Sequence, residues 1–245
     1  MADLQPISIK VKGLRKVFGA TTALEGAELV FEEGIMHGVI GPEGAGKTTL
    51  MRIMLGLMKP TAGTVEFYKG GQPVAFEDVR ADIAYMPQQQ SLYADLSIAE
   101  HLDFFREMYG IEHDVFVKTK DELLKITRLD KFIDRPAGKL SGGMYKKLGL
   151  MCALLRAPRV MLLDEPTNGV DPISRREFWE MLYRLSDQKI LIIVTTAYMD
   201  EAERCVQVHL MEGGKVVEEG EPRQLLTRSN VRSFDELFLK RGGRG

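Results

Sequence analysis

The stretch "IMHGVIGPEGAGKTTLMRIMLGL", residues 35–57, places an apolar run, a glycine-rich turn and an amphipathic pattern one after another. The apolar run predicts a buried strand, and Leu50, Met54 and Leu57 recur on one face of a helix. The turn between them, "GPEGAGKT" at 41–48, has the G-x-x-x-x-G-K-T spacing of a loop that cradles phosphates. Because this loop joins a predicted strand to a predicted helix, the sequence indicates a P-loop nucleotide-binding fold of the α/β class.

The chemistry of this loop comes from its backbone and from two side chains. Glycines let the backbone N–H groups turn inward onto phosphate oxygens. Lys47 is expected to reach the β- and γ-phosphates, and the Thr48 hydroxyl is expected to bind Mg²⁺. The predicted nucleotide-binding residues of the loop are Gly41, Gly44, Ala45, Gly46, Lys47, Thr48 and Thr49.

The composition is that of a soluble globular chain without a general attraction to polyanions. The 245 residues are 44% hydrophobic and 28% charged, with a formal net charge of −2, so nucleic acid is not an expected partner. Cys152 and Cys205 lack a metal-type spacing and are interpreted as reduced thiols in a reducing compartment. The histidines are scattered and predict no zinc site; they are His37, His101, His113 and His209.

The rest of the chain alternates between strand and helix signals. "ISIKVKGL" at 7–14 and "AELVFEEG" at 27–34 predict an antiparallel β layer. Helical patterns dominate 91–157, with a capping box at Ser97 and a helix end at Gly110. Strands and helices then alternate again, which favours a mostly parallel sheet.

These signals divide the chain into three parts. Residues 1–90 and 158–225 are expected to form the α/β core with its N-terminal antiparallel portion. Residues 91–157 are expected to form a helical subdomain, and 226–245 a short C-terminal tail with a loose "RGGRG" end. A helix is also predicted to begin near Tyr198.

A second motif supplies carboxylates. "VMLLDEP" at 160–166 is a buried strand that ends in Asp164 and Glu165. A strand that ends in a solvated acidic pair is common, but next to a complete phosphate loop the pair is better explained by catalysis. Asp164 is expected to hold Mg²⁺ through water, and Glu165 to orient or deprotonate the attacking water.

A third motif predicts another anion site. "LSGGMYKK" at 140–147 puts Ser141 at a helix N-cap, with two glycines in the first turn. A capped helix N-terminus with accessible N–H groups can hold an anion. Lys146 and Lys147 are interpreted as a solvated face of the same helix, or as groups that could approach the phosphates of a partner.

In order and spacing, the motifs resemble those of the nucleotide-binding subunit of ATP-binding cassette (ABC) transporters over about residues 5–225. They are the phosphate loop, "YMPQ", "LSGGM", "LLDEP" and "GVDP". The resemblance implies a RecA-like P-loop NTPase core and head-to-tail pairing of two cassettes. Each ATP would lie between the phosphate loop of one cassette and the signature motif of the other, which in this chain is "LSGGM" at 140–144. Ser141 and Gly143 would then meet the γ-phosphate of ATP held by the partner.

Further roles follow from the resemblance alone. Phe18 falls where the family stacks an aromatic ring on adenine, and Asp171 falls in the loop that crosses between cassettes. Gln88 would meet Mg²⁺, together with Thr48 and Asp164, and report to the membrane subunit. Lys47, Gln88 and Glu165 are thus the expected catalytic residues.

Two positions depart from the family pattern. Met144 replaces the usual glutamine of the signature, a variant associated with exporters. Ala197 replaces the histidine that would contact the γ-phosphate, and it predicts slow hydrolysis unless Tyr198 or a partner compensates.

The function implied is an ATPase that binds and hydrolyses Mg-ATP at a dimer interface and powers export through separate integral membrane subunits. The second cassette could be identical or different. Without a leader or a spanning segment, the chain is expected in the cytoplasm, peripheral on the inner face of the cell membrane. Leu92, Tyr93 and Leu96 suggest a docking surface for the membrane subunit, or else local packing. The alternatives are a soluble cassette that acts on ribosomes or DNA, and a hydrolysis-impaired half of a tandem or heterodimeric cassette.

Overall fold

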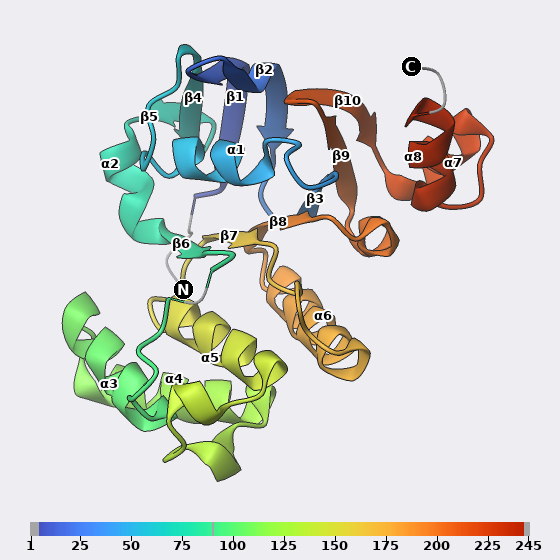
Figure 1. Cartoon of the computed structure of the whole chain (residues 1–245). Helices are drawn as coiled ribbons and strands as arrows, with labels where there is room; N and C mark the ends of the chain where they lie inside the picture. Colours follow the sequence, from blue (N-terminus) through green and yellow to red (C-terminus); the bar gives the residue numbers. More distant parts are fainter. Residues whose placement is uncertain (1–4, 90, 243–245) are drawn as a thin grey trace.

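The structure is a computed structural model that describes residues 5–89 and 91–242. Two β-sheets lie one above the other, with helices between them and below (Figure 1). The upper, antiparallel sheet has the order β2-β1-β4-β5. Its strands are β1 (Ile7–Phe18), β2 (Thr21–Phe31), β4 (Ala62–Lys69) and β5 (Gln72–Val74). The predicted antiparallel layer is therefore confirmed.

The larger sheet has the order β10-β9-β3-β8-β7-β6, and all neighbours are parallel except β9 and β10. Its strands are β3 (Met36–Ile40), β6 (Ile83–Met86), β7 (Val160–Asp164), β8 (Leu191–Thr196), β9 (Gln207–Glu212) and β10 (Lys215–Gly220). Every residue of β3, β7 and β8 is buried, as expected for parallel strands covered on both faces. The carboxyl ends of these strands meet at one edge, where the predicted site residues follow.

Helix α1 (Lys47–Met54) packs between the two sheets (Figure 1). Leu50 and Met54 are buried as predicted, but Leu57 is 66% exposed and lies beyond the helix. The helix ends early because Gly56 adopts a left-handed conformation (φ +68°), and the Leu57 N–H returns to the Arg52 carbonyl. The prediction for Leu57 was wrong.

The other helices cover the lower face and the two ends of the larger sheet (Figure 1). They are α2 (Phe76–Val79), α3 (Ile98–Tyr109), α4 (His113–Thr127), α5 (Gly142–Leu154), α6 (Pro172–Ser186), α7 (Pro222–Ser229) and α8 (Phe234–Gly242). Short 3₁₀ turns are Arg80–Asp82, Asp130–Phe132, Ala137–Lys139 and Met199–Arg204. No helix of the described ranges is long and apolar enough to span a bilayer.

Local capping signals were accurate. Ser97 and Glu100 form the predicted capping box of α3, and Gly110 ends that helix in the left-handed conformation. The segment after Tyr198 is a 3₁₀ turn and not the expected α-helix. The first two residues of "RGGRG" belong to α8, and the remaining three lie outside the described residues.

Candidate nucleotide site

The phosphate loop is pressed against its neighbours so closely that only glycine fits at two positions. A Cβ at Gly41 would lie 2.2 Å from the Met211 carbonyl oxygen, and one at Gly46 would lie 2.4 Å from that of Ala23. Gly46 is also left-handed (φ +101°) and gives α1 no side-chain cap. Since the first N–H groups of a helix have no partner within it, the loop presents donors suited to an anion.

Lys47, the first residue of α1, follows this loop and lies beside an acidic side chain. Its Nζ donates to the carbonyl oxygens of Gly41 at 2.7 Å and Pro42 at 3.0 Å. It is also 3.1 Å from Glu165 Oε1, and both side chains are buried. The ends of β3 and β7 thus bring a cation and a carboxylate together in a water-poor site.

Asp164 is held by hydroxyl groups from three other elements. Its Oδ1 accepts from Thr48 at 3.1 Å and from Thr195 at 2.7 Å, and its Oδ2 accepts from Tyr85 at 3.3 Å. Burial and the nearby Asp164 raise the pKa of Tyr85 to about 12, so the phenol remains a donor. Sequence reasoning missed Thr195 and Tyr85. Pairing of the parallel strand ends, with Asp164 opposite Thr195, is the signal that could have found Thr195.

Glu165 has an unusual backbone. Its φ is +46°, in the left-handed region that non-glycine residues adopt infrequently. Its N–H donates to the Thr195 hydroxyl at 2.9 Å, which fixes this turn. The side chain accepts from Gln88 Nε2 at 2.9 Å and Asn168 Nδ2 at 3.2 Å. Gln88 therefore contacts Glu165, and Asn168 is a contact that the sequence did not suggest.

The signature segment forms the start of α5. Ser141 is exposed and caps the helix, accepting the Met144 N–H at 3.3 Å. A Cβ at Gly143 would lie 2.4 Å from that of Ser174, so glycine lets α5 approach α6. Helices α1 and α5 belong to cores on opposite sides of the larger sheet (Figure 1).

The remaining predicted residues lie at the edges of the site. Phe18 is 46% exposed at the end of β1, with Lys16 Nζ 5.0 Å from its ring centre. Asp171 caps α6 by accepting a hydrogen bond from the Ser174 N–H. Hydrogen bonds from the backbone and side chain of Ser174 lower the pKa of the Asp171 carboxyl. Ala197 follows Thr196, whose carbonyl accepts the Gly41 N–H at 3.1 Å, so position 197 lies beside the phosphate loop.

The two lysines of the signature helix are buried, which corrects their interpretation as a solvated face. Lys146 Nζ donates to the Gln88 carbonyl at 3.2 Å, and burial lowers the pKa of Lys146. Lys147 pairs with Glu177 at 2.6 Å. The helix is buried nearly all round, so both ammonium groups turn to polar partners on neighbouring elements.

The segment predicted as a docking surface is only partly exposed. Tyr93 is 58% exposed and stacks edge-on against Phe104. Leu92 and Leu96 are half-buried, and the Leu92 N–H donates to the Tyr145 hydroxyl at 2.8 Å. The segment thus packs locally while presenting one aromatic ring.

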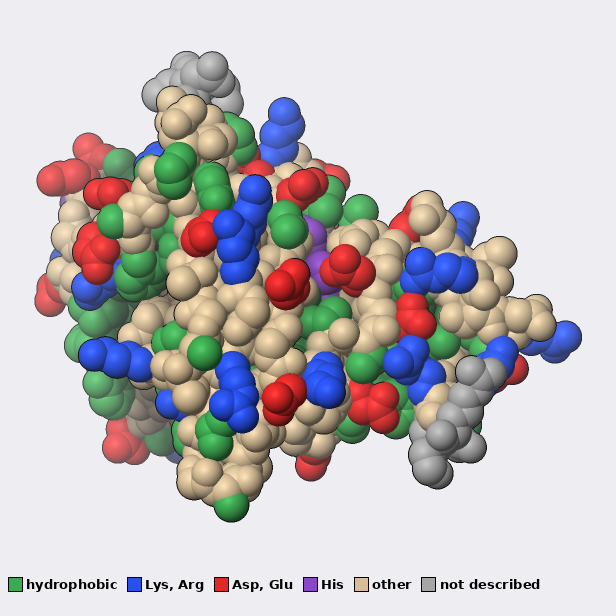
Figure 2. All heavy atoms as spheres, turned by 90° about the horizontal axis from the view of Figure 1, so that it is seen from above, with side chains coloured by type: hydrophobic (Ala, Val, Ile, Leu, Met, Phe, Trp, Pro, Cys, Tyr) green, Lys and Arg blue, Asp and Glu red, His purple; other side chains and the backbone are tan. Residues whose placement is uncertain are grey.

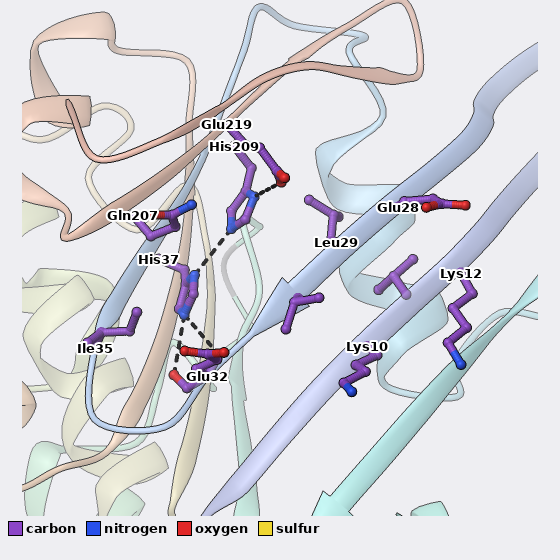
Figure 3. A pocket seen from close by; sticks show the side chains of 12 residues that line it. Lys10, Lys12, Glu28, Leu29, Glu32, Ile35, His37, Gln207, His209 and Glu219 are labelled. Atoms are coloured by element: carbon purple, nitrogen blue, oxygen red, sulfur yellow. Dashed lines mark hydrogen bonds and ion pairs between the residues drawn. The ribbon is translucent and has the colours of Figure 1, made fainter. Parts of the chain in front are cut away.

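His37 and His209 are far apart in the sequence but lie side by side in the structure (Figure 3). The Glu32 N–H donates to His37 Nε2, His37 Nδ1 is 3.2 Å from His209 Nε2, and His209 Nδ1 is 3.3 Å from Glu219. One choice of tautomers satisfies all three bonds. Burial, with a contribution from His209, lowers the pKa of His37 to about 4, and burial lowers that of His209 to about 4.

This pair lines a cavity of about 450 Å³ with side chains of both charges around it, visible as a hollow in Figure 2. The cavity adjoins strands β1 and β2, and its lining includes none of the residues 41–48 of the phosphate loop. In the described part of the chain, no group of three or more histidine, cysteine or acidic side chains could hold a metal. Cys152 and Cys205 are buried and unpaired, and burial raises the pKa of both thiols.

Comparison with known proteins agrees with this geometry. The model of the ABC transporter family matches residues 24–168. The probable multidrug ABC transporter ATP-binding protein YbhF of Escherichia coli is 42% identical over 229 residues, which are 92% of this chain and 39% of that protein. The Nod factor export ATP-binding protein I of Ralstonia nicotianae is 35% identical, over 89% of this chain and 68% of that protein. A solved ATP-binding subunit of an ABC transporter superposes with a TM-score of 0.81 at 28% identity, covering 95% of this chain and 98% of that one.

The chain therefore belongs to the ABC transporter family, and its fold is that of the family's ATPase cassettes. The predicted α/β P-loop fold and the assignment to nucleotide-binding ATPase domains are confirmed. The chain spans 39% of the length of the Escherichia coli relative.

Proposed function

We propose that this chain binds and hydrolyses Mg-ATP in a site shared by two cassettes, and that hydrolysis powers export through integral membrane subunits. The observation that carries the proposal is the buried meeting of Lys47 and Glu165 at the phosphate loop, 3.1 Å apart. A cation suited to phosphate and a carboxylate suited to activate water are both needed to hydrolyse a phosphoanhydride.

Each group has a distinct role in this proposal. Lys47 binds the β- and γ-phosphates together with the loop amides, and Glu165 orients and deprotonates the attacking water. Thr48 and Asp164 supply hydroxyl and carboxylate oxygens within 3.1 Å of each other, the donor set that Mg²⁺ prefers. The ion would neutralise phosphate charge when bound, and Gln88 would approach it from beside Glu165.

A second cassette completes the site. Ser141 and the Gly143 amide would meet the γ-phosphate of ATP held by the partner, and Asp171 would lie at the crossing between cassettes. The exposed Ser141 hydroxyl and the absence of an acidic side chain in the first turn of α5 support an anion there. Phe18, exposed at the end of β1, would stack on adenine.

Export is proposed from the names of the relatives, a probable multidrug ABC transporter ATP-binding protein and a Nod factor export ATP-binding protein. The membrane subunit would dock at the exposed ring of Tyr93, on the segment that begins at Gln88. The cassette would then lie on the inner face of the cell membrane.

The test compares the full chain with Glu165→Gln in a phosphate-release assay with Mg-ATP. The wild-type chain should hydrolyse ATP, and the variant should bind ATP equally well but lose hydrolysis. Copurification of the chain with ribosomes, and not with a multi-span membrane protein, would contradict the export proposal.

A further inference from the structure

Two buried side chains of α5 fix the backbone of the segment that follows β6. Lys146 Nζ donates to the Gln88 carbonyl at 3.2 Å. Four residues further on, the Leu92 N–H donates to the Tyr145 hydroxyl at 2.8 Å. The backbone of Gln88 is therefore attached to the signature helix, while its side chain points elsewhere.

The Gln88 side chain reaches the proposed catalytic carboxylate. Its Nε2 donates to Glu165 Oε2 at 2.9 Å. A glutamine side chain has several rotatable bonds, so the amide stays on the carboxylate only if its backbone is also held. Lys146 provides that second attachment.

Comparing Lys146 with Lys147 distinguishes a residue that positions Gln88 from a buried lysine that contributes only to stability. Lys147 is equally buried, and its ammonium group is paired with Glu177 at 2.6 Å. Lys146 has no carboxylate within ion-pair distance among the described residues, although Asp164 and Glu165 attract it from further away. Burying an ammonium group without an ion pair is costly in free energy. The Lys146 ammonium group donates its hydrogen bond to the carbonyl of Gln88, whose side chain contacts Glu165.

We propose that Lys146 is a positioning residue for hydrolysis: it holds the Gln88 carbonyl so that the Gln88 amide stays on Glu165. Lys146 itself touches no reacting atom. The proposal rests on the ATPase function proposed above.

The experiment measures ATP affinity and the single-turnover rate of hydrolysis separately in the full chain. Lys146→Met should lower the rate about tenfold and change the affinity less than twofold, because misplacement affects the chemical step. Lys146→Arg, which keeps a long cationic donor, should recover most of the rate. Lys146→Gln, whose side chain is polar but shorter, should lower the rate as much as Lys146→Met. It is measured in place of Lys146→Met if the apolar variant is insoluble.

A matched control and a double-mutant cycle make the test specific. Lys147→Met removes the neighbouring buried lysine and should lower thermal stability without changing the rate. Gln88→Ala should slow hydrolysis, and adding Lys146→Met to it should cause no further loss, because both act through one contact. Additive losses, or a normal rate in both Lys146→Met and Lys146→Gln, would overturn the proposal. Normal hydrolysis by Glu165→Gln would contradict the ATPase proposal. Loss of hydrolysis in Glu165→Gln together with a normal rate in both Lys146 variants would contradict only the positioning role of Lys146.

Discussion

The N-termini of α1 and α5 are built in opposite ways. Helix α1 starts after a left-handed Gly46 with no side-chain cap, and Lys47 at its first position is 3% exposed. Helix α5 starts at an exposed Ser141, whose hydroxyl already accepts the Met144 N–H. The first has uncapped donors and a buried cation, whereas the second is a capped helix end at the surface.

The two helix N-termini also differ in the charged groups that lie near them. At α1 the cation and the carboxylate come from one chain, since Lys47 lies beside Glu165. At α5 the nearby lysines are committed elsewhere, Lys146 to Gln88 and Lys147 to Glu177. In the function proposed above, the α1 end would hold a nucleotide with groups of its own chain, and the α5 end would complete a site on another cassette.

The largest effect should come from removing the cation at α1. Lys47→Met should weaken ATP binding on the order of 100-fold, because charge-assisted contacts to phosphate contribute about 3 kcal/mol. Titration calorimetry with Mg-ATP measures this directly. Lys69→Met, which breaks a surface ion pair with Asp82, is the control and should bind normally. Normal binding by Lys47→Met would remove the distinction between the two helix ends.

Acid should act on the α1 side of the molecule through His37 and His209, which lie on the strands beside the phosphate loop. In the unfolded chain these rings take up protons near pH 6.5, but in the folded chain only near pH 4. The unfolded state binds more protons between these values, so stability should fall from pH 6.5 to 4, by at most about 3 kcal/mol per ring.

Urea unfolding as a function of pH measures this effect. The double variant His37→Gln and His209→Gln should lose much of the pH dependence, although it starts less stable. Replacement of the exposed His113 by Gln should leave the dependence intact. Equal stability of the wild-type chain at pH 7 and pH 4.5 would contradict burial of the pair as neutral rings.

At α5, Ser141→Ala should leave the ATP affinity of the single chain unchanged and slow hydrolysis by the paired cassettes about tenfold, through loss of one donor. It should also cost about 1 kcal/mol of stability, because the cap is lost. Ser97→Ala removes the cap of α3 and should cost similar stability with no effect on hydrolysis. Equal rates in the two variants would mean that Ser141 acts only as a cap.

A smaller gain is expected at Ala197, which lies beside the phosphate loop. Ala197→His should raise the turnover number several-fold with little change in ATP affinity, because an imidazole adds a donor in the transition state. Ala197→Leu, which adds bulk but no hydrogen-bond donor, controls for size. If Ala197→His has no effect while Glu165→Gln abolishes hydrolysis, the missing contact comes from another residue.

The sequence predicted what local chemistry determines and missed what distant segments bring together. The glycine spacing at 41–48, the acidic end of β7 and the cap at Ser141 each depend on a few adjacent residues. His37 and His209 are 172 positions apart, so their pairing depends on β3 lying next to β9.

The signature helix shows a second reason for error. Ten of its thirteen residues are buried, so its hydrophobic pattern has no clear solvent side from which the position of Lys146 could be inferred. Asn168 was missed because its contact with Glu165 depends on the left-handed turn at that residue, and Thr195 was missed because its contact with Asp164 depends on β8 lying next to β7. Leu57 was misplaced because a glycine one residue earlier ends the helix.

In the proposed dimer, the α1 end of one cassette and the α5 end of another form one ATP site. Sedimentation velocity of the full chain carrying Glu165→Gln, at saturating Mg-ATP, tests it most directly, because hydrolysis cannot then release the partner. A dimer that holds two ATP molecules, and that is lost when Ser141→Glu is added, is the predicted result. A monomer with ATP bound would contradict self-pairing of this chain.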